Sequence, residues 1–164
     1  MRLVERIDLD IRKAYKSLDD PDLRFKHEMM IRQPYSAVQS ALTERFDNDL
    51  RDDTDPNVDV SFVWGLERRG RIWIVFISMI GPYAAVTREE GDPIAPNVVV
   101  GSDEDETALL HIIQEFGFTV LDKTMLERPC KLRLFNTEPE RIRIFQALFA
   151  NTDLLPWERP SIEY

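Results

Sequence analysis

Closely spaced carboxylates are the side chains of this sequence that could do chemistry most directly. Four oxygen-bearing residues occupy every second position from 53 to 59, which is the spacing of the first ligands in an EF-hand calcium loop. Such a loop also requires glycine at its sixth position and a bidentate glutamate at its twelfth, where this chain has Val58 and Trp64. The pattern therefore predicts a solvated acidic loop, with no metal and no cofactor. The four residues are Asp53, Asp55, Asn57 and Asp59.

Other residue patterns that support catalysis do not occur in the sequence. His27 and His111 are the only histidines and lie far apart, and Cys130 is the only cysteine. A serine in a G-x-S-x-G turn and the glycine-rich phosphate-binding motifs are both missing. The sequence therefore favours a protein that is not an enzyme.

The excess of acidic residues indicates which partners suit the chain. With 30 acidic and 21 basic residues the formal net charge is −9, which opposes binding to nucleic acid or to an anionic membrane. The same charge suits a basic protein partner, so we expect the acidic segments to bind one, although loop solvation and helix capping would also account for them. The candidate partner-binding residues are Asp47, Asp49, Asp52, Asp53, Asp55, Asp103, Glu104, Asp105 and Glu106.

Two alternative functions remain open at this level. A small-ligand-binding protein or an enzyme would need a pocket between sheet and helices, which Trp64, Trp73 or Tyr83 could line, although aromatic residues in strands more often belong to a core. A homo-oligomeric adaptor subunit would associate through a sheet edge or through the proline-containing C-terminal tail.

The element that must position these residues is a three-stranded antiparallel meander over about 58–88. Apolar residues alternate in its first strand, which ends at the turn-forming segment Arg68-Arg69-Gly70-Arg71. Ile72–Ile80 is apolar on both faces, as in a central strand that is covered on both sides. Gly81-Pro82 then allows a second turn.

Before the meander, Leu3–Leu18 has helical apolar spacing, although a strand remains an alternative. Residues 23–31 alternate and predict a half-buried strand. A helix should open at Pro34, with an apolar stripe that ends at Leu50. The acidic loop over 47–57 would then lead into the meander.

After the meander, Glu89–Pro96 predicts a loop and 97–100 a short strand. Ser102 should cap a helix whose buried stripe reaches Phe116 and which ends at Gly117. Two further strands are predicted over 118–121 and 131–135, with a single helical turn between them. A capping box over 137–140 would open the last helix.

Strands and helices follow one another without a regular βαβ alternation, which predicts an α+β fold. We expect one domain over 1–164, in which a largely antiparallel sheet packs against about four helices, with an extended tail from about residue 152. One cysteine and a charged N-terminal segment indicate the cytoplasm. In size, acidity and class the chain resembles bacterial immunity proteins, which neutralise toxin enzymes that are often basic nucleases. The resemblance implies an inhibitor of a basic partner.

Overall fold

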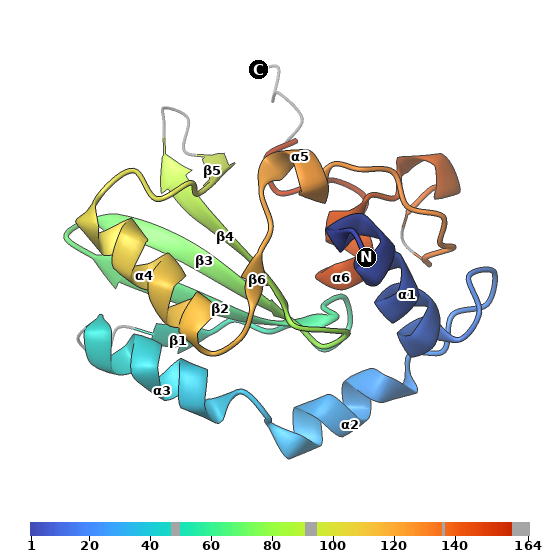
Figure 1. Ribbon diagram of the computed structural model, residues 1–164, viewed down its shortest axis with the longest axis horizontal. Helices are drawn as coiled ribbons and strands as arrows, with labels where there is room; N and C mark the ends of the chain where they lie inside the picture. The colour runs from blue at the N-terminus through green and yellow to red at the C-terminus, as the bar shows by residue number, and fades with distance from the viewer. Residues whose placement is uncertain (47–49, 91–94, 136, 159–164) are drawn as a thin grey trace.

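The antiparallel meander forms as the alternation predicts, at the centre of an α+β fold (Figure 1). A computed structural model describes residues 1–46, 50–90, 95–135 and 137–158. Arg69 and Gly70 both have positive φ between the first two strands, which is the geometry of a two-residue type I′ hairpin turn. The meander strands are β2 (Ser61–Arg68), β3 (Arg71–Ser78) and β4 (Tyr83–Glu90).

Three short strands extend the meander into a mixed, mostly antiparallel sheet of six strands. The order is β1-β2-β3-β4-β5, with β1 and β5 antiparallel to their neighbours. The strand β6 pairs in parallel with the first residues of β4, so β5 and β6 share the outer side of β4. The added strands are β1 (Leu50–Asp52), β5 (Ala95–Val98) and β6 (Thr119–Val120).

Helices cover both faces of the sheet because the central strand is apolar on both sides. On the face that we call the α4 face, Trp64, Trp73 and Val86 pack under three helices. These are α2 (Arg24–Arg32), α3 (Ser36–Arg45) and α4 (Glu104–Glu115). On the other side, the α1 face, Val63 and Phe76 pack under three more helices. These are α1 (Leu3–Tyr15), α5 (Lys123–Leu126) and α6 (Ile144–Leu148).

The short helix α6 is tied to the sheet and to α1 by side-chain hydroxyl groups. Tyr15, Ser61 and Ser78 are fully buried, and each donates a hydrogen bond to a backbone carbonyl at the C-terminal end of α6. The last carbonyls of a helix have no partner within the helix, so these hydroxyls satisfy acceptors at the helix end, and the carbonyl of Phe149 also accepts the N–H of Val60. The acceptors are the carbonyls of Ala147 at 2.6 Å, Phe149 at 2.8 Å and Leu148 at 2.8 Å.

The helix α4 begins one residue later and ends where the sequence predicts. Its N-cap is Asp103 rather than Ser102, because the Asp103 carboxylate accepts the backbone N–H of Glu106. Gly117 has a φ of +91°, and the N–H groups at 117 and 118 bond back to the carbonyls of 114 and 113. This is a Schellman motif. The predicted stripe is too long by one member, because the side chain of Phe116 is 44% exposed.

The alternation over 23–31 predicts a strand, but the segment is part of α2. Phe25 and Met29 are one helical turn apart as well as alternate, and both pack against the sheet. Ile31, which a strand would bury, is 69% exposed. The strand prediction is therefore wrong. Phe25 and Met29 are four residues apart, a spacing that places them on one face of a strand and also on one face of a helix.

The segment over 131–135 is not a strand of the sheet. Leu132 and Leu134 are buried as their alternation predicts. The N–H of Arg133, however, bonds to the carbonyl of Leu18 at 2.8 Å, in the loop after α1. The extended backbone thus finds its partner in a loop rather than in β4 or β5.

Both loops predicted beside the meander contain short edge strands. The segment over 47–57 includes β1, so Leu50 lies in a strand and α3 ends at Arg45. The segment Glu89–Pro96 includes the end of β4 and the start of β5, where Glu89 pairs with Pro96. Proline is tolerated there because an edge strand does not need every N–H.

The chain on both sides of η1 (Pro139–Arg141) also differs in detail from the prediction. Thr137 does not form a capping box, and its hydroxyl donates to the carbonyl of Thr152 at 2.6 Å. Instead Gln146 accepts the N–H of Arg143 at the start of α6. Between 152 and 158 the chain packs on the core, because Leu155 is buried and the ring of Trp157 lies edge-on against Phe145.

Candidate functional site

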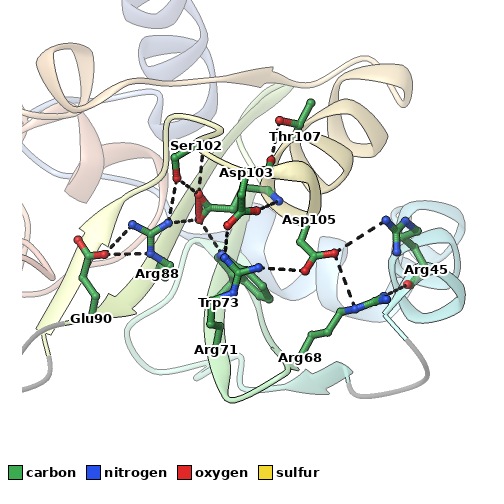
Figure 2. A network of polar contacts seen from close by, with 11 residues as sticks. Arg45, Arg68, Arg71, Trp73, Arg88, Glu90, Ser102, Asp103, Asp105 and Thr107 are labelled. Atoms are coloured by element: carbon green, nitrogen blue, oxygen red, sulfur yellow. Dashed lines mark hydrogen bonds and ion pairs between the residues drawn. The ribbon is translucent and has the colours of Figure 1, made fainter.

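Carboxylates and arginines form an ion-pair network at the start of α4 (Figure 2). The four carboxylates come from α4 and the end of β4, whereas the four arginines come from α3, β2, β3 and β4. The hairpin turn brings two of the arginines opposite each other in the register. The members are Arg45, Arg68, Arg71, Arg88, Glu90, Asp103, Asp105 and Glu106.

Glu106 is the buried centre of this network. Its carboxylate accepts hydrogen bonds from the indole N–H of Trp73 at 3.0 Å, from the guanidinium of Arg88, and from the hydroxyl of Ser102 at 2.6 Å. Burial alone would raise the pKa of Glu106, but the hydrogen bonds from Ser102, Trp73 and Arg88 outweigh it and lower the pKa below its usual value. The side chain is therefore held as a carboxylate that is matched by charge and by hydrogen bonds.

Asp103 and Asp105 also form ion pairs within the chain. Arg71 reaches both carboxylates, with 2.9 Å to Asp105, and its hydrogen bond lowers the pKa of Asp103. Arg68 and Arg45 approach the other side of Asp105 at 3.7 and 3.9 Å. Glu104 is the member of the acidic helix start whose side chain points to solvent. The predicted acidic segment at α4 is thus largely neutralised by arginines.

Asp52, Asp53 and Asp55 lie at the edge of the sheet, in and just after β1, and all three are exposed. Asp53 and Arg51 approach each other at 3.5 Å and lie across Gly65 of β2. A Cβ at Gly65 would come within 2.7 Å of the Arg51 guanidinium and 2.8 Å of the Asp53 carboxylate. Glycine is therefore what lets these two side chains lie flat on the sheet.

The carboxylates of Asp52 and Asp55 accept hydrogen bonds from neutral groups. Asp52 accepts from the N–H and the hydroxyl of Thr54, and Asp55 accepts the N–H of Asn57. Within the described ranges, no lysine or arginine forms an ion pair with either residue. Asp47 and Asp49 of the same predicted set lie outside the described residues. Asp52 and Asp55 therefore keep negative charge that no ion pair among the described residues neutralises, with only the nearby charge of Lys26 acting on Asp55.

Asp59 is a buried carboxyl group that the sequence interpretation treated as part of the acidic loop. It accepts the N–H of Asp55 at 2.7 Å and forms an isolated β-bridge with Ala150. Burial raises the pKa of Asp59 to about 6, and the hydrogen bond from the Asp55 N–H and the nearby charge of Lys26 offset this only in part. Alternation with Val58 and Val60 places Asp59 on the opposite side of the strand from these apolar residues, so the local pattern predicts exposure. The segment that pairs with it is at Ala150, far along the chain, so no local signal indicated burial.

The aromatic residues predicted to line a pocket are buried within the core. Trp64 is stacked against Phe62, and Trp73 packs edge-on against Phe46. Tyr83 is buried on the α1 face and donates a hydrogen bond from its hydroxyl to Asp10 at 2.6 Å. A cavity that the sequence interpretation did not anticipate lies near Asp10, between α1 and α2.

Comparisons with protein families, with curated proteins and with solved structures find no match to this chain. Within the residues that the structure describes, no three or more histidine, cysteine, aspartate or glutamate side chains are grouped as metal ligands would be. No helix in those same residues is both long enough and apolar enough to cross a bilayer. The function must therefore be argued from the geometry of the chain itself.

Proposed function

We propose that the protein acts by binding a basic protein partner through its acidic sheet edge, which comprises β1 together with Asp52, Asp53 and Asp55. The observation that carries the proposal is the contrast between the two acidic segments. The carboxylates at the start of α4 already face four arginines, whereas those beside β1 are exposed and, among the described residues, only Asp53 has an arginine partner, Arg51. Exposed charges of one sign raise the rate at which an oppositely charged partner associates.

The backbone of β1 supports the same proposal. The N–H of Asp53 bonds inward to the carbonyl of Val63 at 2.8 Å. Because the bonding direction alternates along a strand, the N–H and carbonyl of Asp52 point away from β2. An extended segment of a partner could add to this edge as a further strand. Basic side chains on that segment would then lie beside the exposed carboxylates.

The partner chemistry fits an inhibitor-type role like that of the immunity proteins that the chain resembles in general character. A cytosolic location belongs to the same proposal and is supported by the single cysteine, since a chain with one cysteine can form no internal disulfide. The protein would then act by covering a basic surface of its partner, without chemistry of its own.

A charge-matched comparison tests the proposal. The test variant changes Asp52, Asp53 and Asp55 to Asn, and the control variant changes the exposed Asp19, Asp20 and Glu138 to their amides. The control segments lie away from β1 (Figure 1). Both variants lose three negative charges, so any difference between them reports position rather than net charge.

Proteins captured from lysate by the wild type are compared with those captured by each variant, and binding kinetics are measured on the purified partner. We expect a basic partner that the control retains and the test variant binds with an on-rate about tenfold lower. Added salt should also slow the wild type, because exposed charges are screened over about 8 Å at physiological ionic strength. A partner that binds all three proteins at the same rate, independently of salt, would refute the proposal.

A further inference from the structure

The cleft between α1 and α2 is the part of the molecule that neither the ion-pair network nor the acidic sheet edge explains. Its volume is about 580 Å³, and it extends to the turn that joins β3 to β4. Clefts of roughly 300–1,000 Å³ are typical of small-molecule sites. Along one wall runs α2, which has no fully buried residue, so its apolar side chains are only partly used by the core.

The base of the cleft is apolar. Phe25 and Met29 of α2 contribute one side, and Met79 and Ile80 after β3 contribute the other. Phe25 also packs edge-on against the buried ring of Tyr15, which fixes its position. An occupant of this cleft therefore needs an apolar body, and the flexible methionine side chains can adapt to its shape.

The rim of the cleft is basic, although the chain as a whole is acidic. Four cationic side chains line it together with three carboxylates. The cationic residues are Lys13, Lys16, Arg24 and Arg32. The carboxylates are Asp10, Asp22 and Glu28. The excess of one positive charge contrasts with the net charge of −9 for the whole chain.

The three carboxylates each have partners within the fold. Asp22 is held by Arg24 at 2.6 Å and by Lys16 at 3.4 Å, and Arg32 lies 3.8 Å from Glu28. Asp10 accepts the hydroxyl of Tyr83 at 2.6 Å.

Lys13 is the basic group of the rim that remains for a ligand. It forms no ion pair with any residue in the described part of the chain. Its side chain is exposed and lines the cleft together with the apolar residues.

We propose that this cleft binds a small amphipathic organic anion, with its acidic head group at Lys13 and its apolar body over Phe25, Met29 and Met79. Charge complementarity sets the sign of the head group, and the apolar base sets the chemistry of the body. The site is distinct from the acidic sheet edge, so the two proposals can fail independently.

Binding can be measured with 1-anilinonaphthalene-8-sulfonate, a fluorescent amphipathic anion, on the full chain. We expect saturable fluorescence that decanoate displaces and that decyltrimethylammonium, a cation with the same chain length, does not. Near-UV circular dichroism confirms that the protein stays native during the titration, because this dye also binds partly folded states.

Three variants locate the site. Lys13→Gln removes the positive charge that has no ion-pair partner among the described residues and should weaken decanoate binding about fivefold. Lys123→Gln on α5 makes the same charge change elsewhere and should leave decanoate binding unaltered. Ala14→Phe should fill the cleft and abolish binding while keeping every charge.

Four outcomes would overturn the proposal. They are the absence of saturable binding, equal displacement by the cation, wild-type affinity in both cleft variants, and binding to phosphatidylglycerol vesicles without binding to decanoate. The last outcome would assign the basic rim to a membrane surface instead of a small molecule.

Discussion

Replacing Glu106 with alanine tests whether the network at the start of α4 stabilises the fold. The substitution removes the acceptor of two groups, the indole N–H of Trp73 and the guanidinium of Arg88. Trp73 is fully buried, whereas the side chain of Arg88 is 23% exposed. A buried ion pair that loses one partner typically costs about 3–5 kcal/mol. Arg88 can recover some hydration and Trp73 cannot, so we expect about 4 kcal/mol, in the middle of that range.

The measurement is urea denaturation followed by tryptophan fluorescence. Glu106→Gln keeps an acceptor oxygen and should cost less than Glu106→Ala. The matched control is Glu104→Ala, two residues earlier in the first turn of α4, whose exposed side chain should contribute about 0.5 kcal/mol through the helix dipole. A double-mutant cycle with Arg88→Met isolates the pair itself.

The pH dependence provides a second readout with a defined sign. The folded-state pKa of Glu106 lies below its ordinary value of 4.5. Its carboxylate therefore stabilises the fold fully above that pH, and the contribution is lost as the pH falls through the folded-state pKa. The difference between wild type and Glu106→Gln should shrink in acid. If Glu106→Ala costs no more than Glu104→Ala, the reasoning that a buried, fully bonded carboxylate supports this helix is refuted.

Two further changes test the backbone and a buried acid. Gly117→Ala should lower the free energy of unfolding by about 1 kcal/mol and the melting temperature by about 2–4 °C in calorimetry. The cause is backbone strain alone, because φ at Gly117 is +91° and an added Cβ would meet no neighbour. An unchanged melting temperature would contradict the strain argument. Asp59→Asn should flatten the dependence of stability on pH between pH 4 and 6, measured by urea melts. The pKa of Asp59 is raised from 3.8 to about 6 in the folded state, so the wild type loses stability as the pH rises through that window. The same pH dependence in wild type and variant would contradict this prediction.

The sheet could be predicted because its signals are local. The period-2 alternation and the Arg69-Gly70 turn together determine the hairpin register without information from distant residues. The segment over 131–135 shows the limit of that reasoning. Its alternation correctly predicts that Leu132 and Leu134 are buried, but the hydrogen-bond partner of its backbone is Leu18, more than a hundred residues earlier in the sequence.

The candidate site was predictable only as a set of charged segments. Whether a carboxylate faces solvent or an arginine depends on strand neighbours that local pattern does not reveal. One signal was present in β4, where Arg88 follows Ala84 and Val86 on the same face of a strand whose first five residues are buried. A cation at that position requires a buried anion nearby, and Glu106 provides it.

The three hydroxyl groups that bond to the C-terminal end of α6 affect the order in which the chain completes its fold during synthesis. Tyr15 is translated 132 residues before the carbonyl that it binds, and Ser61 and Ser78 precede theirs by 88 and 70 residues. At about 5–20 residues per second, the wait for Tyr15 is roughly 7–26 s. From the synthesis of Phe76 until that of α6, the α1 face of the sheet has no α6 to cover Val63 and Phe76. A nascent chain thus presents this apolar surface to chaperones and to neighbouring chains until α6 leaves the ribosome.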